Sequence, residues 1–358
     1  MNRGVRLRPA QRERLKQAYA YTLLAVVFWT TGPVGAKATL MAERGPARLT
    51  PLQVAFWPIA LGWVALLGVS LARRRLGRLA DISARGWIVI GAMGLTGWAG
   101  YSVSLNIAYT LLPLPSAMVI GYLNPVFVVL FQSAAFGSLV RPVSRWELAS
   151  KARRRPPVLR LAVGLMLCLL GVAVIATGGR LSALRGGWSP GALAAAVGAI
   201  CWGLYSNLGR FVAVRPGRDP KGLGDVQNIG AMALGSIILA AGLAATHNLY
   251  PPTGFETALY FGGLGPARVS AWAPIVVMAV ANYGAAYTLW LYALEKAEGM
   301  GEAHKLPPLT YLVLVLAIGG GWLVLRESFG RGFWQGASLI ALGNLVTLWP
   351  TRRGPMRA

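Results

Sequence analysis

Long apolar stretches separated by short polar segments fill most of the chain. A segment needs about 20 mostly apolar residues to cross the ~30 Å hydrocarbon core of a bilayer. Ten such stretches are predicted, at residues 19–40, 51–72, 86–108, 114–136, 158–178, 191–213, 226–245, 270–293, 303–324 and 333–349. The pattern therefore predicts an all-α membrane protein with ten transmembrane helices.

The basic residues gather in every second gap between these stretches. With the N-terminus placed in the cytoplasm, 27 of the 35 lysines and arginines fall on the cytoplasmic side. This is the bias of the positive-inside rule, and it accounts for the net charge of +24 without a nucleic-acid partner. We therefore predict a multi-pass protein of the inner (cytoplasmic) membrane, with both termini in the cytoplasm.

Composition agrees with a chain whose solvent is the lipid bilayer. It is 55% hydrophobic and 13% charged, whereas a soluble domain carries about 25% charged residues. The basic N-terminus leads into a long span without a small-residue cleavage site, which favours a retained first helix over a signal peptide. Cys168 and Cys201 lie inside apolar stretches without metal-ligand spacing, so no metal or cofactor is expected.

The stretches divide into two groups of five. An odd number of spans places the second group upside down relative to the first, as in transporters built from inverted repeats. Trp29 and Lys37, eight residues apart, recur as Trp202 and Arg210 at the same spacing. The predicted organisation is a basic cytoplasmic arm (1–18), a first five-helix repeat (19–178), an external linker (179–190), a second five-helix repeat (191–349) and a basic cytoplasmic tail (350–358).

The acidic residues argue against catalysis. None of the eleven falls in the middle of an apolar stretch, and there is no paired-carboxylate, HExxH, phosphate-binding or Ser/His pattern. The protein is therefore not expected to be an enzyme. Because intramembrane acids are the usual parts of proton relays, flow down a solute gradient is expected rather than tight proton coupling.

Aromatic and amide side chains fall near the middle of several stretches. Aromatic residues of the interfacial belts belong at the two membrane surfaces, so a belt does not explain these. They are interpreted either as ordinary helix packing or as the wall of a binding cavity with polar partners. The candidate substrate-binding residues are Trp29, Tyr101, Tyr122, Asn124, Trp202, Tyr205, Asn282, Tyr283, Tyr287 and Trp290; Trp98 lies at a similar depth.

Three basic residues are candidates for gating. Lys37 either extends its ammonium group to the membrane surface or attracts an anionic carboxylate. His304 and Lys305, before the ninth stretch, either lie among the headgroups or gate the inner mouth.

Backbone features suit a carrier that moves. Pro33, Pro58 and Pro125 fall inside stretches and are candidate helix kinks. Glycines at 91, 94, 97 and 100 recur every third residue, which lets another helix approach closely.

Several motifs resemble the drug/metabolite transporter superfamily, specifically its EamA-type permeases. They are FWTTGPVGAK (28–37), CWGLYSNLGR (201–210), LWLYAL (289–294) and LVLRES (323–328). GYLNP (121–125) and FWQGA (333–337) are similar to the aromatic amino-acid exporter branch. The resemblance implies that the first, third, fourth, sixth, eighth and ninth helices surround a central cavity.

The resemblance also implies export of a small amphipathic metabolite, with amino acids, aromatic ones included, as the leading expectation. One half would rock against the other to expose a midplane site to each side in turn. Two alternatives stay open: efflux of drugs or quaternary cations through cation–π attraction, and a non-transporting sensor or assembly factor, whose partner would bind at residues 247–269. The oligomeric state, a homodimer included, is left open.

Overall fold

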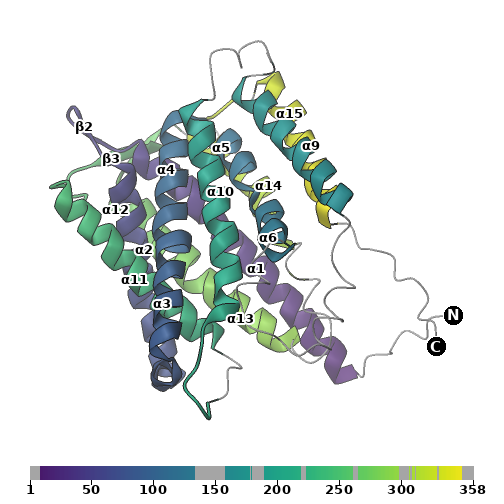
Figure 1. The fold of residues 1–358 in the computed structure, drawn as a ribbon. Helices are drawn as coiled ribbons and strands as arrows, with labels where there is room; N and C mark the ends of the chain where they lie inside the picture. Colours follow the sequence, from purple (N-terminus) through teal and green to yellow (C-terminus); the bar gives the residue numbers. More distant parts are fainter. Residues whose placement is uncertain are drawn as a thin grey trace.

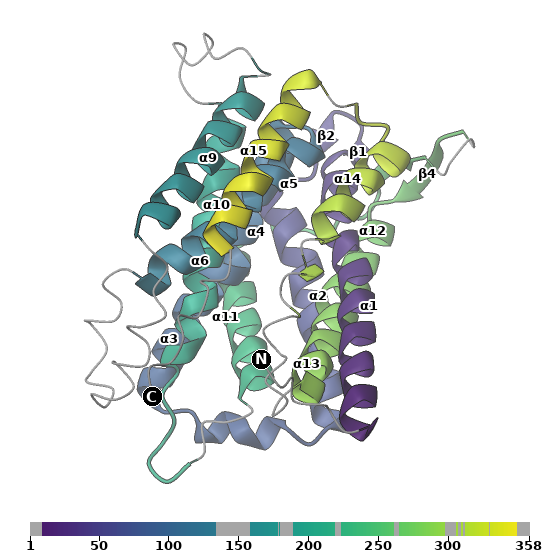
Figure 2. The same ribbon diagram turned by 90° about the vertical axis from the view of Figure 1, so that its right-hand side faces the viewer.

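The computed structural model describes residues 9–133, 158–177, 179, 189–218, 223–260, 265–297, 306, 309–310, 312–328 and 330–348. Within them the chain is mostly helical, and the long helices run side by side (Figures 1 and 2). The first part contains α1 (Pro9–Leu40), α2 (Pro51–Ala72), η1 (Leu76–Asp81), α3 (Ala84–Met93), η2 (Gly94–Gly100), α4 (Tyr101–Leu111), α5 (Leu114–Gly121), α6 (Asn124–Ser133) and α9 (Val158–Ala176). The second part contains α10 (Pro190–Leu208), η4 (Gly209–Phe211), α11 (Gly224–Ala245), α12 (Trp272–Val277), η5 (Met278–Ala285), α13 (Ala286–Ala297), α14 (Leu312–Leu325) and α15 (Arg331–Leu348).

Six helical segments of the described chain are long and apolar enough to cross a membrane. They are Gln11–Leu40, Pro51–Ala72, Ala84–Leu111, Pro190–Phe211, Gly224–Ala245 and Trp272–Ala297, and shorter apolar helices run over Leu114–Val128, Met166–Ile175 and Leu312–Leu325. Large apolar side chains cover the outside of the bundle; Ile88 is 74% exposed and Met166 is 67% exposed. Such a surface would be an aggregation hazard in water and is suited to lipid.

Local signals set some helix boundaries. Helix α2 begins and ends where the pattern predicts, because Thr50 and Gln53 form a capping box: the backbone N–H of each donates to the side chain of the other. Helix α1 begins at Pro9, ten residues before the predicted apolar start, because its polar N-terminal turns continue the same helix.

The fourth apolar stretch corrects an expectation. It was predicted as one helix over residues 114–136, but α5 ends at Gly121 and α6 begins at Asn124. Pro125 is the second residue of α6, where its missing N–H costs no helical hydrogen bond. Pro33 and Pro58 instead lie inside α1 and α2, which continue through them, so a kink at either remains a prediction.

Strands are also present, so the expectation of an all-α protein is incomplete. The strands β1 (Glu43–Arg44), β2 (Ala47–Arg48), β3 (Glu256–Leu259) and β4 (Ala267–Ser270) form an antiparallel sheet in the order β2-β1-β3-β4. Glu43 pairs with Glu256, which joins the hairpin after α1 to the connection between α11 and α12. We call this end of the bundle the strand end. The opposite end, which carries Arg73 and Arg75, is called the arginine end.

Helices from the two halves of the sequence alternate in the bundle. Helix α1 packs most extensively on α13, and α2 on η5; in the same way α10 packs on α4, and α11 on η2. Figure 2 shows α1 beside α13, and both views show α9 alongside α15 at an edge. Neither half therefore packs mainly on itself.

The same close helix approach occurs twice, and each half of the chain supplies the glycine once. A Cβ atom at Gly62 of α2 would lie 2.4 Å from the Cβ of Tyr283 in η5, and one at Gly235 of α11 would lie 2.5 Å from the Cβ of Trp98 in η2. These two glycines are 173 positions apart, the separation that also relates the two tryptophans of the sequence repeat. The packing repeats as the sequence does.

Candidate functional site

Eight aromatic rings meet midway along the bundle. The ring centroids of Tyr101 and Trp202 are 4.7 Å apart, and Trp202 continues to Tyr205 at 5.1 Å. Trp98 links Tyr205 to Tyr283 and Tyr287, the last at 5.3 Å. Tyr287 then contacts Trp29, which contacts Trp290. We call this set the aromatic cluster: Trp29, Trp98, Tyr101, Trp202, Tyr205, Tyr283, Tyr287 and Trp290.

Two π-helical turns place the central rings. Trp98 lies in η2 and Tyr283 lies in η5, each between α-helical segments of one continuous helix. A π-turn inserts an extra residue into a helix, which rotates the side chains that follow, and such turns are frequent at functional sites. The apolar pattern did not predict them, because one inserted residue changes the helical period only locally.

Small residues allow these rings to approach. A Cβ atom at Gly97 would lie 2.2 Å from the Tyr205 ring, and one at Gly32 would lie 2.6 Å from Asn282 Oδ1. Gly94 and Gly100 are similarly crowded, by α11 and by Cys201. The predicted close approach is thus confirmed at three of the four spaced glycines; Gly91 has an ordinary contact.

Few polar groups lie beside these rings, and none of the eight members is ionised at neutral pH. The Tyr205 hydroxyl donates to Asn228 Oδ1 at 2.6 Å. Asn282, 8% exposed, lies against Gly32 of α1. The indole N–H of Trp98 is buried without a hydrogen-bond acceptor among the described residues.

Tyr122 and Asn124 lie at the break between α5 and α6, and two gating candidates lie outside the described residues. Tyr122 follows α5 at the break and packs against the same apolar core as Trp29 and Tyr101. Asn124, half-buried, begins α6 beyond the same break. His304 and Lys305 lie outside the described residues. The structure therefore brings seven of the ten predicted binding residues into one ring cluster and places Asn282 beside it.

Lys37 is held inside the strand end. Its side chain is 14% exposed, and Nζ lies 3.4 Å from Glu327 Oε1 beyond the end of α14. Nζ also donates to the carbonyls of Tyr109 and Leu112, and Glu327 Oε2 accepts from the Leu114 backbone N–H at 2.6 Å. Of the two interpretations of Lys37, these contacts do not favour extension to the membrane surface, because a carboxylate and two carbonyls bind its ammonium group within the protein. A role in attracting the carboxylate of a solute stays a prediction.

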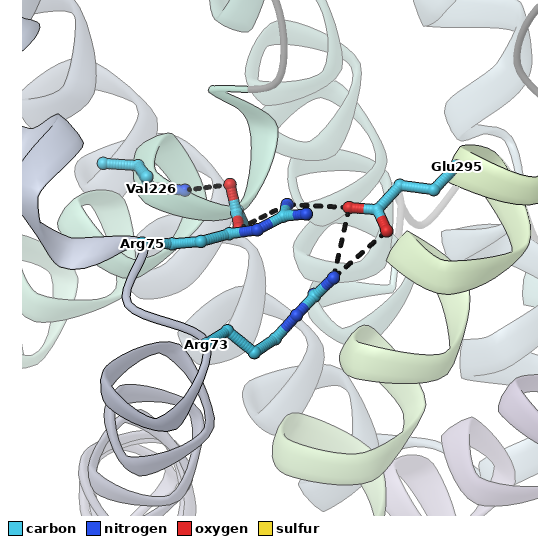
Figure 3. A network of polar contacts seen from close by, with 5 residues as sticks. Arg73, Arg75, Val226 and Glu295 are labelled. Atoms are coloured by element: carbon cyan, nitrogen blue, oxygen red, sulfur yellow. Dashed lines mark hydrogen bonds and ion pairs between the residues drawn. The ribbon is translucent and has the colours of Figure 1, made fainter.

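A second charged network joins three helices at the arginine end. Arg75 lies 3.0 Å from Asp225 of α11 and 2.7 Å from Glu295 of α13, and Arg73 lies 3.1 Å from Glu295 (Figure 3). Asp225 also accepts from the Val226 backbone N–H, and its side chain is 5% exposed. Partial burial lowers the pKa of Arg75, but hydrogen bonds to Asp225 and Glu295 outweigh burial and raise it above the ordinary value.

These carboxylates were not predicted as site residues. Glu327, Asp225 and Glu295 each lie just beyond an end of an apolar stretch, where charge is expected anyway. The useful signal was weak: an acid directly after an apolar helix, as in LVLRES (323–328). Their partners are distant in sequence, so only the folded chain shows which cation each one binds.

An apolar bundle of membrane-length helices around a buried aromatic cluster defines a multi-pass membrane protein. The profile of the EamA-like transporter family matches residues 16–145 and again residues 189–349. The chain therefore belongs to the EamA-like transporter family, whose members are transporters rather than enzymes and take small-molecule substrates.

The chain is also similar to one characterised exporter and to one solved structure. The aromatic amino acid exporter YddG of Ancylobacter novellus is 23% identical over 299 residues, which cover 82% of this chain and 83% of that protein. A crystal structure of a protein 22% identical superposes with a TM-score of 0.50 over 95% of this chain and 99% of the other. At that identity the superposition supports the fold alone.

Proposed function

We propose that this protein exports small amphipathic metabolites, above all amino acids including aromatic ones, by alternating access. The observation that carries the proposal is the aromatic cluster, which gathers rings from both halves midway along the bundle. Offset or edge-on ring contacts are the favoured packing for an aromatic solute. Similarity to a protein named as an aromatic amino acid exporter supports the same substrate class.

The proposed arrangement is ten membrane-crossing helices in two inverted five-helix repeats. Two separate family matches and the repeated Gly62 and Gly235 contacts support a duplication. By the positive-inside rule, the arginine end and both termini lie on the cytoplasmic side of the proposed inner membrane, and the strand end lies outside. The proposed repeats are residues 19–178 and 191–349, joined by an external linker at residues 179–190.

The contacts favour moving bodies that differ from the two sequence halves. Helices α1, α2, α12, η5, α13 and α14 pack on one another as one body, and α3, η2, α4, α6, α10 and α11 as another, and α2 also packs extensively on α11 across the boundary. The aromatic cluster lies between them. The first body contributes Trp29, Tyr283, Tyr287 and Trp290; the second contributes Trp98, Tyr101, Trp202 and Tyr205. Rocking of these bodies would open the cluster at either end in turn.

Each end of the boundary carries a charged contact suited to a gate. At the strand end, Lys37 of the first body, paired with Glu327, donates to the Tyr109 carbonyl of α4 in the second body. At the arginine end, Arg75 from the first body binds Asp225 of the second. Alternating access requires these two contacts to break in turn, and each is a small set of polar bonds that water can replace.

Counterflow in proteoliposomes tests the proposal. Vesicles loaded with unlabelled L-phenylalanine, L-tryptophan, L-leucine or tetraphenylphosphonium would receive a trace of the labelled compound. Accumulation of the amino acids without accumulation of tetraphenylphosphonium is the expected result. Accumulation of the cation alone would favour the efflux alternative, and failure of every solute to accumulate or to stabilise the purified protein would favour a non-transporting role.

A further inference from the structure

Trp98 combines a fully enclosed ring with an unused hydrogen-bond donor. Its side chain is 2% exposed, and its Nε1 atom is buried with no acceptor among the described residues. Buried polar groups in proteins nearly always have a partner, so each exception requires an explanation. An indole N–H can only donate, so the missing partner is an acceptor.

The protein fixes this donor in place. Trp98 lies in the π-turn η2, and Gly235 of α11 packs directly on its Cβ. Its ring contacts the rings of Tyr283 and Tyr287 from the other moving body. The neighbouring Tyr205 hydroxyl already donates to Asn228. The orphaned N–H thus lies in the aromatic cluster, at the boundary that alternating access would open.

Among the described residues, two other indole N–H groups are buried without an acceptor, those of Trp57 and Trp63 of α2. Trp57 contacts Phe56 and Trp272, outside the aromatic cluster. Both residues are themselves only partly buried, whereas Trp98 is enclosed. Trp98 is therefore the orphaned donor that belongs to the candidate site, and Trp63 is a matched control.

We propose that the Trp98 indole N–H binds the carboxylate of the transported solute. This inference rests on the proposed function and deepens it, because it separates the candidate substrates by chemistry. A carboxylate accepts the bond, whereas an amine cation or a quaternary ammonium ion has no acceptor to offer. With no ionised member in the cluster, the rings hold the apolar part of the solute and Trp98 selects its acid group.

An isosteric replacement tests the donor alone. Nonsense suppression at position 98 would insert benzothienylalanine, which keeps the bicyclic ring and replaces N–H by sulfur; the control carries the same change at position 63. Binding of L-phenylalanine and of phenethylamine, which lacks the carboxylate, would be measured on both purified variants. A hydrogen bond to a charged group corresponds to roughly 10- to 100-fold in affinity.

We expect the Kd for L-phenylalanine to rise about tenfold or more at position 98 and to stay within about twofold at position 63. The Kd for phenethylamine should be unchanged in both variants. Equal losses for both compounds at position 98, or no loss for either, would overturn the inference while leaving the proposed function intact. If neither L-phenylalanine nor L-tryptophan binds the unaltered protein, the proposed function falls and this inference with it.

A second measurement needs no variant, so it tests the inference even if the variant at position 98 does not fold. In the unaltered protein labelled with ¹⁵N-indole at position 98, L-phenylalanine should shift the N–H proton resonance downfield, as a new hydrogen bond does. Phenethylamine should leave it in place. Identical responses to the two compounds would contradict the role of the donor.

Discussion

Lys37 and Glu327 lie 3.4 Å apart and together bind both sides of the break between α4 and α5. The ammonium group of Lys37 binds carbonyls at the C-terminus of α4, and the carboxylate of Glu327 binds the first N–H of α5. Helix C-termini carry partial negative charge and N-termini partial positive charge. Each ion therefore binds the helix end of opposite charge, and the two ions also pair with each other.

We predict that Glu327→Gln lowers both the melting temperature and the transport rate, the rate by about tenfold or more. The substitution leaves Lys37 buried without its counter-ion, which costs far more than an exposed charge would. Thermal unfolding and counterflow rates would be measured for Glu327→Gln, Lys37→Met and the double variant. The double variant should lose less than the two single losses combined; additive losses would contradict a direct pair. Glu43→Gln, in an exposed pair with Arg48, should change neither property.

Gly62→Ala and Gly235→Ala should each destabilise the protein by roughly 1–3 kcal/mol, because overpacking forces neighbouring backbone and side chains apart. The added methyl group would lie 2.4 Å or 2.5 Å from a neighbouring Cβ atom. Gly68→Ala in the same helix as Gly62 is the control, since nothing lies within 4 Å of its added methyl group. It should leave stability unchanged or raise it. Equal effects at positions 62 and 68, measured by thermal unfolding in detergent, would disprove the close packing.

Trp202→Ala should abolish counterflow while leaving expression and folding intact. It removes the ring that joins Tyr101 to Tyr205 in the aromatic cluster. Trp334→Ala on α15 is the matched control, because that ring is 58% exposed on the outside of the bundle. Counterflow at the unaltered rate in Trp202→Ala would remove the aromatic cluster as the binding site.

Arg75→Gln should loosen the arginine end and expose the interior from that side. It leaves Asp225 without the cation it binds. The native thiols report the change: Cys201 is half-buried beside Gly100, and Cys168 is buried beneath α15. Labelling of Cys201 by N-ethylmaleimide should accelerate several-fold while that of Cys168 does not. Lys16→Gln, in an exposed pair with Glu13, should alter neither rate.

Counterflow should not require an imposed pH gradient. No carboxylate belongs to the aromatic cluster, and intramembrane carboxylates are the usual elements of proton relays. Rates would be compared with internal and external pH equal and with a gradient of one pH unit. Accumulation only under the gradient would show proton coupling, and the Glu327 carboxylate would then be the first residue to examine.

Much of the fold could be predicted because its signals are local. The bounds of α2 follow from its apolar run and from the capping residues Thr50 and Gln53, which are three positions apart. The aromatic residues were identified by their depth within each stretch, which depends only on counting along a helix. Four short strands were not predicted, because strands of two to four residues carry little periodicity. A kink was predicted at Pro125, whereas the structure has a break between Gly121 and Asn124.

What the sequence determined by itself was the class of protein and the set of residues near the middle of the apolar stretches, because hydrophobicity and helical rise act on neighbouring residues. What only the tertiary structure decided was the partners of those residues. Lys37 meets a carboxylate 290 positions away, and Trp98 meets rings from the opposite half. Such contacts depend on which helices lie side by side and on two π-turns that rotate their faces. Neither can be predicted from a single apolar stretch.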